Sequence, residues 1–313
     1  MVAFLLLVIL LLQLKDAVIS TSTSSLSLSD VVRQGAGLYV DPSNMGRKHS
    51  HHYQNLNKTV LVTAINHGYL NFLHNFKCFL DMLSMKAVVL SLDQKAHEYV
   101  HEHLINFYSY YLTIGNETVH ESATEFRSKQ FHLITNRKIE GVLRILKLGY
   151  DAIFIDPDIA LLRDPTPYLF WQGIDYVHSV NKICPGSDAW DFYQTEEEGN
   201  TGLYFIKSNA RTIQLLENFI ITYPKHPELD DQTILWTMLR SMKSPQIDPK
   251  PKCSHIVGDS SHPETLVTCH LDGCLFSAGG LRGAAYNWLE AAVKKRNESV
   301  VSIHANFVKG MCY

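Results

Sequence analysis

The sequence predicts an α/β protein built on a mainly parallel β-sheet that is flanked by helices. Two observations support this prediction. Short apolar segments rich in β-branched residues alternate along the chain with longer segments whose apolar residues recur at helical spacing. The short segments are apolar throughout, as expected for strands covered on both faces of a parallel sheet. With 313 residues, of which 46% are hydrophobic, the chain can bury the core of one large domain.

Three strands and three helices are expected from these patterns. The predicted strands are the apolar segments at residues 59–65, 86–92 and 151–155. Helical spacing predicts helices over residues 69–85, 94–107 and 135–148. Asp93 is placed to cap the second helix, and Gly149 directly follows the third. In such sheets ligands bind at the carboxyl ends of the strands, so polar residues that follow a predicted strand are candidates for a functional site.

The composition excludes several classes of protein. A disordered chain would be poorer in apolar residues and would carry more net charge than −3. The 17 glycines, 11 prolines and 6 cysteines are too few for a collagen-like chain or a small disulfide-stapled domain. Because basic residues are not in excess, we expect no nucleic-acid partner.

The N-terminal segments indicate a secretory protein. Residues 2–12 form an apolar run that is too short to span a bilayer comfortably, so residues 1–20 are predicted to be a signal peptide or a short signal anchor. Residues 21–56 are rich in Ser and then in His, which predicts a flexible stem. The main folded domain is then expected over residues 57–313. The N-terminus could anchor the protein to a membrane.

The glycosylation sequons and the cysteines also indicate a protein of the secretory pathway. Glycosylation sequons begin at Asn57, Asn116 and Asn297. An even number of cysteines permits disulfides in an oxidising compartment, with several possible connectivities. The first candidates for pairing are Cys253, Cys269 and Cys274.

A pair of carboxylates carries the strongest chemical signal. Asp156 and Asp158 follow the strand predicted at residues 151–155 and are separated by Pro157. Carboxylates at i and i+2 lie on the same side of an extended chain, and the proline stiffens the pair. Hard oxygen ligands close together suit Mg²⁺ or Mn²⁺. The alternative is a turn that carries two solvated acidic residues.

Six segments resemble one known family in their order along the chain. They are VLVTAINHGYLNFLHNFKCFL (60–80), VVLSLD (88–93), KIEGVLRILKLGYDAIFIDPDIALLRDP (138–165), NTGLYFIKSN (200–209), LDDQTIL (229–235) and HANFVKG (304–310). Together they resemble the nucleotide-diphospho-sugar transferase domain typified by glycosyltransferase family 77. The resemblance implies a Rossmann-like GT-A fold, a nucleotide-sugar donor, expected to be UDP-linked, and a divalent cation, usually Mn²⁺. It also implies a hexosyl- or pentosyltransferase of the Golgi lumen that acts on a glycan or glycoprotein hydroxyl with retention of configuration.

By position in these motifs, Asp156 and Asp158 resemble the family's metal-binding pair, and Asp156 is also expected to contact the donor. His304 resembles the histidine that completes the metal site, with a purely structural histidine as the alternative. Lys309 and Gly310 are then expected to meet the diphosphate. Pro157 departs from the family pattern, because a small residue is commoner there, and proline offers no N–H to the donor.

The resemblance assigns further residues to the donor and to catalysis. Thr63, Asn66, Lys138 and Gly202 are expected to bind the donor, and a surface charge is the alternative for Lys138. The candidate catalytic residues are Asn200, Asp231 and Gln232. For Asp231, capping of the helix that it begins is an equally open interpretation.

Other functions remain open at this point. Residues 97–101 read His-Glu-Tyr-Val-His, the HExxH pattern of zinc proteases, and Glu121 lies at a plausible distance for a third ligand. A solvated, His-rich helix is the alternative for this segment. An aspartyl phosphatase also places its nucleophile after a buried strand. A protein that binds nucleotide sugars without turnover is the third alternative.

Overall fold

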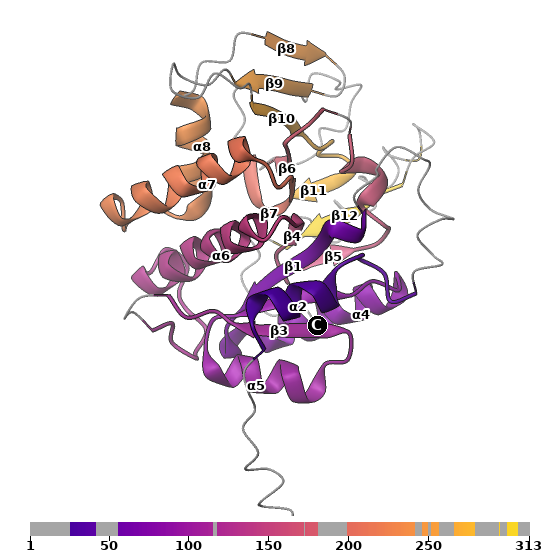
Figure 1. Cartoon of the computed structure of the whole chain (residues 1–313), viewed down its shortest axis with the longest axis vertical. Helices are drawn as coiled ribbons and strands as arrows, with labels where there is room; N and C mark the ends of the chain where they lie inside the picture. The colour runs from indigo at the N-terminus through magenta and orange to yellow at the C-terminus, as the bar shows by residue number, and fades with distance from the viewer. Residues whose placement is uncertain are drawn as a thin grey trace, which may run out of the picture.

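The centre of the protein is a nine-stranded sheet with the strand order β3-β2-β1-β4-β7-β6-β10-β9-β8 (Figure 1). The structure is a computed structural model that describes residues 26–41, 56–114, 118–171, 173–180, 199–241, 246–249, 252–256, 266–278, 294 and 299–305. The strands of this sheet are β1 (Thr59–Ile65), β2 (Ala87–Ser91), β3 (Phe107–Tyr111), β4 (Asp151–Ile155), β6 (Tyr176–Val180), β7 (Gly199–Ile206), β8 (Gln246–Pro249), β9 (Lys252–Ile256) and β10 (Leu266–His270).

Among these strands, only β7 and β9 run against the common direction. Strands β3, β2, β1 and β4 pair in parallel, and β6 pairs in parallel with β10. Strand β7 is inserted antiparallel between β4 and β6. The prediction of a mainly parallel sheet is therefore confirmed. Because β1, β4, β6 and β10 share a direction, their carboxyl ends lie on the same edge of the sheet, where ligands bind in folds of this kind.

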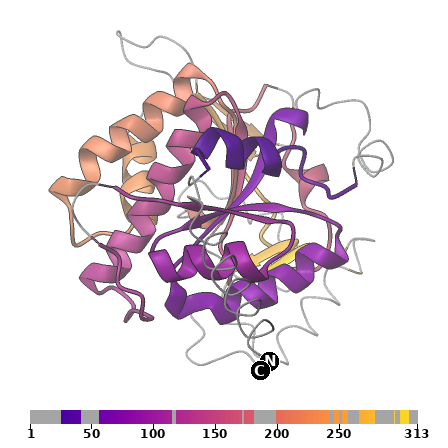
Figure 2. The ribbon, with the colours of Figure 1, turned by 60° about the horizontal axis from the view of Figure 1, so that its bottom comes forward.

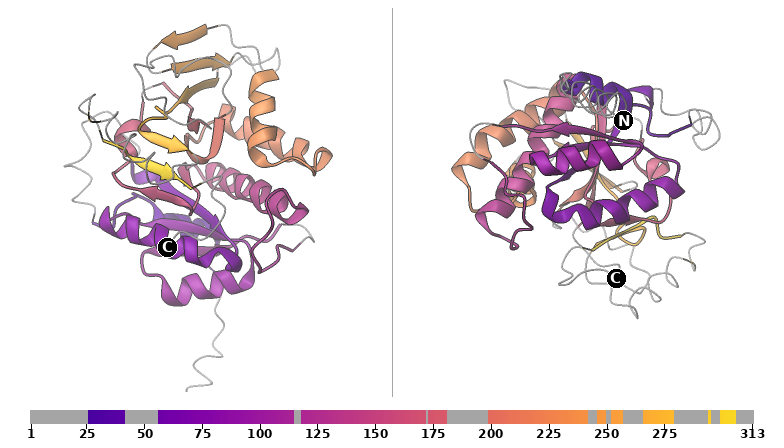
Figure 3. Two further views of the ribbon diagram at one scale, coloured as in Figure 1. Left: turned by 180° about the vertical axis from the view of Figure 1, so that it is seen from behind. Right: turned by 90° about the horizontal axis from the view of Figure 1, so that it is seen from below.

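Helices cover both faces of the sheet (Figures 1 and 2). Helices α2 (Leu28–Gly35), α6 (Lys129–Lys147), α7 (Ala210–Thr222) and α8 (Asp231–Ser241) pack on one face. On the other face lie α4 (Leu70–Met82), α5 (Gln94–His103) and a small sheet of β5 (Ile159–Leu161), β11 (Phe276–Ala278) and β12 (Ser302–His304). Seen from behind, β11 and β12 lie in front of the central strands (Figure 3).

The predicted strand bounds are confirmed where the apolar pattern is continuous, and so are the predicted helix cap and the glycine after α6. Strands β1 and β4 have the predicted bounds, and every residue of β4 is buried. Asp93 caps α5, because its Oδ1 accepts a hydrogen bond of 2.9 Å from the N–H of Ala96. Gly149 follows α6 with φ of +82°, a conformation that favours glycine.

Three helix ends differ from the prediction, and one of them is that of α4, which ends at Met82 and not at Met85. Helix α5 ends at His103, because Phe107 begins β3, a strand whose mixed sequence FYSYY hid it inside the expected helix. Helix α6 begins at Lys129, where the hydroxyl of Ser128 accepts from the N–H of Phe131. Lys138 is therefore in the middle of a long helix and not near its start.

Part of the predicted stem belongs to the folded domain. Helix α2 buries Val31 and Val32 against the sheet, and the following Leu38 and Tyr39 are buried as well. The hydroxyl of Tyr39 donates to Asp164 Oδ2 at 2.5 Å. The predicted signal segment, residues 1–20, lies outside the described residues. In the described part of the chain, no helix has the length and apolar character needed to cross a bilayer.

Candidate functional site

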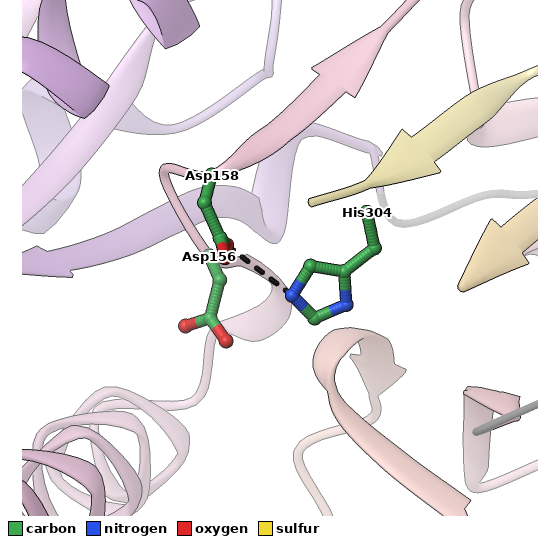
Figure 4. A group of neighbouring side chains, drawn as sticks. All are labelled: Asp156, Asp158 and His304. Atoms are coloured by element: carbon green, nitrogen blue, oxygen red, sulfur yellow. Dashed lines mark ion pairs between the residues drawn. The ribbon is translucent and has the colours of Figure 1, made fainter. Parts of the chain in front are cut away.

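Asp156, Asp158 and His304 meet at the carboxyl edge of the sheet. Their candidate ligand atoms all lie within 4.8 Å of one another, and within the described residues they form the one such group of three His, Cys, Asp or Glu side chains. Nε2 of His304 is 3.2 Å from Oδ1 of Asp158. Figure 4 shows the two carboxylates and the imidazole directed toward the same space. We call these three residues the metal triad.

Local backbone geometry brings the triad together. The N–H of Ile159 donates to the carbonyl of Asp156 at 3.1 Å, which closes a turn with Pro157 at its second position, where proline is favoured. The chain between the two carboxylates therefore turns and is not extended as predicted. After the turn, β5 pairs antiparallel with β12 and sets His304 opposite Ile159. Residues far apart in the sequence thus converge through one short ladder.

Lys138 lies between two carboxylates. Its Nζ is 3.2 Å from Asp156 Oδ2 and 3.1 Å from Asp231 Oδ2. The lysine and Asp231 are almost completely buried, and Thr201 also hydrogen-bonds the Asp231 carboxylate. Lys138 also lies over the ring of Phe154, 5.2 Å from its centre. The alternative of a surface charge is therefore wrong, because this ammonium group is buried and paired with Asp156 and Asp231.

The charges in the site are coupled. Burial raises the pKa of Asp156 to about 6, although Lys138 opposes this shift. Burial also raises the pKa of Asp231. Burial would raise the pKa of Asp158 too, but the neighbouring His304 holds it below its usual range. For His304, burial acts to lower the pKa, and Asp158 outweighs it and raises the pKa. Lys138 stays charged, because its two carboxylates outweigh burial and raise its pKa.

The start of β7 packs against the triad. The N–H of Asp156 donates to the carbonyl of Gly202 at 2.7 Å, and Oδ1 of Asn200 accepts from the N–H of Gly202 at 2.8 Å. A β-carbon at Gly202 would lie only 2.4 Å from the imidazole of His304. Glycine at this position therefore lets the β7 backbone approach the histidine, and Asn200 fixes that backbone.

Thr63 and Asn66 lie at the carboxyl end of β1. Both are fully buried. Oγ1 of Thr63 and Oδ1 of Asn66 have no hydrogen-bond partner in the part of the chain that the structure describes. Nδ2 of Asn66 donates to the carbonyls of His120 and Ser122 at 2.7 and 3.0 Å. Asn66 thus holds the segment after β3 in place and keeps one oxygen available.

The sequence left two roles open for Asp231, a cap of helix α8 and a residue of the active site, and the structure gives the cap to its neighbour Asp230. Oδ1 of Asp230 accepts from the N–H of Thr233 at 2.8 Å, so Asp230 is the residue that caps the helix. Asp231 faces Lys138 instead. Gln232 is half-buried beside it, and Lys309 and Gly310 lie outside the described residues.

Sequence reasoning gave no separate role to Thr201 or Asp230. These two residues stand inside the quoted motifs NTGLYFIKSN and LDDQTIL, which is the signal that could have found them.

The HExxH segment lies on α5 with Glu98 and His101 exposed, His97 half-buried and Val100 in the core. The rings of His97 and His101 are 6.3 Å apart, but Nδ1 of His97 contacts Ser109 Oγ at 2.8 Å. Glu121, the expected third ligand, pairs with Lys95 at 2.5 Å. No third ligand joins the two histidines within the described residues.

The donor set of the triad fits the implied cation. Two carboxylates and one imidazole suit Mn²⁺, which accepts oxygen and nitrogen ligands together. Ligand atoms within 4.8 Å of one another can share a single ion, since each metal–ligand bond is about 2.1 Å or more. The side chains of Asp156 and Asp158 are 23% and 30% exposed, so a further ligand can reach an ion held there.

Three relatives with assigned activities share similarity with this chain. A beta-arabinofuranosyltransferase of Arabidopsis thaliana is 26% identical over 81% of this chain and 45% of its own length. A UDP-D-xylose:L-fucose alpha-1,3-D-xylosyltransferase of the same plant is 30% identical over 81% of this chain and 66% of its own length. A UDP-galactose:fucoside alpha-3-galactosyltransferase of Dictyostelium discoideum is 27% identical over 58% of this chain and 31% of its own length. The chain therefore spans from about a third to about two thirds of these relatives.

A solved structure of the galactosyltransferase LgtC, with donor and acceptor sugar analogs, covers 79% of this chain and 86% of its own, with 12% identity and a TM-score of 0.41. The sequence profile of the nucleotide-diphospho-sugar transferase family matches residues 83–312. That range contains the metal triad, Lys138, Asn200 and Asp231. The characterised relatives are glycosyltransferases. Since the profile matches well over half of the sequence, the chain belongs to the nucleotide-diphospho-sugar transferase family.

Proposed function

We propose that the protein is a metal-dependent glycosyltransferase that moves a sugar from a UDP-sugar to a hydroxyl of a glycan or glycoprotein. The observation that carries this proposal is the metal triad beside the buried Lys138–Asp231 ion pair. Asp156, Asp158 and His304 would hold Mn²⁺. When bound, the ion would stabilise the negative charge of the departing diphosphate.

In this proposal each residue of the candidate site has its own role in binding the cation or the donor. Asp158 and His304 would hold the cation together with Asp156, whose carboxylate also pairs with Lys138 at 3.2 Å. Thr63 and Asn66, with their unpartnered oxygens, face the nucleoside. Asn200 and Gly202 fix the backbone beside the sugar, and the family resemblance implies that Lys309 and Gly310 would meet the diphosphate. The buried carboxylate of Asp231 orients the reacting sugar, with Gln232 next to it.

A retaining outcome and a lumenal location belong to the same proposal. Retention follows from the resemblance to family 77, and an NMR spectrum of the product with the inverted anomer would overturn it. A Golgi-lumen location is supported by the exposed Asn57 of the first sequon and by the register of β9 and β10, which sets Cys253 opposite Cys269. Peptide mapping without reductant would test whether these two cysteines form a disulfide.

Release of nucleoside diphosphate from a panel of UDP- and GDP-sugars tests the activity. We expect release with Mn²⁺ from the wild type, none with chelator, and none from Asp158→Asn. Asp81→Asn is the matched control, because Asp81 is an exposed carboxylate that pairs with Lys77 on α4. Full activity of Asp158→Asn would refute the metal assignment. Donor binding without release, with acceptor glycans present, would identify a protein that binds nucleotide sugars without turnover.

A further inference from the structure

Three aromatic side chains with polar edges meet beyond the residues discussed so far. They are His178 on β6, His270 at the end of β10 and Trp236 on α8. The ring centres of the two histidines are 4.5 Å apart, and the ring of Trp236 lies 5.9 Å from each. All three pairs meet edge to face, with interplanar angles of 75°, 68° and 66°. We call these residues the His–Trp cluster.

The cluster contains a hydrogen-bond donor with nothing to donate to. The indole N–H of Trp236 is buried and has no acceptor in the part of the chain that the structure describes. Nδ1 of His178 lies 3.0 Å from the carbonyl oxygen of Ser179, so this nitrogen carries the proton. Burial lowers the pKa of His178 to about 4, and the ring is neutral at pH 7. A buried donor left unpaired is costly, which argues that the cluster serves more than packing.

Gly199 connects the cluster to the candidate site. A β-carbon at this glycine would lie 2.6 Å from Cε1 of His178 and 3.3 Å from Cε3 of Trp236. The next residue on β7 is Asn200, which holds the backbone beside the metal triad. Trp236 lies on the same helix as Asp231, about a turn and a half further along. The cluster is therefore a direct neighbour of the groups proposed to hold the donor sugar.

The order of strands along the carboxyl edge shows which substrate the cluster would meet. Thr63 lies near the carboxyl end of β1, Asp156 and Asp158 of the metal triad follow β4, and Asn200 is on β7, in the spatial order β1-β4-β7-β6-β10. A nucleotide sugar laid along this edge has its nucleoside at β1, its diphosphate at β4 and its sugar at β7. Strands β6 and β10 are the next positions, each about 4.8 Å further from the nucleoside. The group beyond the donor sugar is the acceptor.

We propose that the His–Trp cluster is the acceptor subsite, where the indole N–H of Trp236 donates to a hydroxyl of the acceptor sugar beside the neutral ring of His178. This inference rests on the proposed transferase function for the order of the substrates. A sugar suits the cluster because it offers hydroxyl oxygens to the indole and C–H groups to the imidazole edges. Arg240 covers one face of the indole at 5.2 Å, which leaves the N–H edge as the contact with the ligand.

Trp236→Phe removes the N–H and keeps a ring beneath Arg240. Trp171→Phe is the matched control, since Trp171 is partly buried and packs against the core on the opposite face of the sheet. The probes are the methyl glycosides of L-fucose, D-galactose and L-arabinose, followed by saturation-transfer NMR on protein that holds Mn²⁺ and UDP. We expect a glycoside to bind the wild type and Trp171→Phe, and to bind Trp236→Phe roughly tenfold more weakly, the loss of one ordinary hydrogen bond.

Calorimetry with UDP and Mn²⁺ on the same samples separates the two proposals and reports on folding. Unchanged UDP affinity in Trp236→Phe, together with the weaker glycoside, supports the acceptor subsite. Equal glycoside binding by Trp236→Phe and the wild type would overturn it, as would a matching loss of UDP affinity or the absence of any glycoside signal. If the wild type binds a glycoside through Trp236 but does not bind UDP, the sugar subsite stands and the transferase proposal fails.

Discussion

Gly202 on β7 lies directly against His304 on β12. A β-carbon at position 202 would be 2.4 Å from Cε1 and 3.0 Å from Nδ1 of the imidazole. On its other side the ring contacts Asp158 through Nε2, at 3.2 Å. The orientation of the histidine is therefore set by the backbone of one strand and the carboxylate of another.

This contact predicts that Gly202→Ala weakens metal binding without unfolding the protein. The added methyl group must push the imidazole away from Asp158, and displacing a ligand by such an indirect contact typically costs about tenfold or more in metal affinity. Titration of Mn²⁺ by calorimetry measures the change. Gly35→Ala is the control, because its β-carbon would meet Cγ2 of Val88 at the same 2.4 Å, far from the site. A Gly202→Ala protein with wild-type affinity would contradict the prediction.

Lys138→Met is expected to lower the free energy of unfolding at pH 7 by about 3 kcal/mol, because two carboxylates lose their shared partner in a buried place. The pKa of Asp231 is already raised in the folded protein and rises further without the lysine. A carboxyl with a raised folded-state pKa favours folding when protonated, so the deficit should shrink as the pH falls to about 5.

Urea unfolding at the two pH values measures this effect. The double variant Lys138→Met/Asp231→Asn should be more stable than Lys138→Met alone at pH 7, since it removes one unpaired charge. An equal deficit at both pH values would show that the lysine acts through packing alone.

Manganese affinity should fall as the medium becomes acidic. The ion needs Asp156 ionised and His304 unprotonated. Burial raises the pKa of Asp156 to about 6, and Asp158 raises that of His304. Protons therefore compete with the metal as the pH falls from above neutrality to below about 6, because Asp156 takes up a proton near the lower end and His304 takes one up at a higher pH than an ordinary histidine. Calorimetric titrations across this range test the trend, and His304→Gln should show a shallower dependence because one of the two protonations is gone.

A chain shortened to begin at residue 26 should fold as the full chain does, whereas one that begins at residue 42 should be unstable. The second truncation removes four buried side chains, those of Val31, Val32, Leu38 and Tyr39. Each would give up about 1.5–3 kcal/mol of hydrophobic burial. Soluble yield and the thermal midpoint compare the two. Equal stability of both chains would mean that α2 packs without contributing to the fold.

Predictability from the sequence follows the apolar pattern. Strands β1 and β4 have the predicted bounds because continuous apolar runs mark strands that are buried on both faces. Strands β6, β10 and β12, with sequences YVHSV, LVTCH and SIH, escaped prediction. Their histidines and hydroxyl residues break the apolar signal at the end of the sheet where polar chemistry gathers. Polar residues at this edge indicate a functional site, and the same polar residues prevent its strands from being recognised by their apolar pattern.

The site was predictable in its members but not in its contacts. The family resemblance named Asp156, Asp158 and His304, and the structure brings these three together. No sequence pattern could predict that Lys138 pairs with Asp231, because the two lie on separate helices whose packing depends on the whole sheet. The His–Trp cluster was missed for the same reason, since its three residues come from β6, β10 and α8.

The metal triad joins residues 156 and 158 to residue 304, which is far along the chain from the two carboxylates. During synthesis the two carboxylates emerge from the ribosome well before the histidine that completes their set. A nascent chain that has not yet reached β12 therefore lacks the third ligand. We expect such a chain to hold Mn²⁺ more weakly than the full chain, so the proposed metal site is completed only after residue 304 has been made.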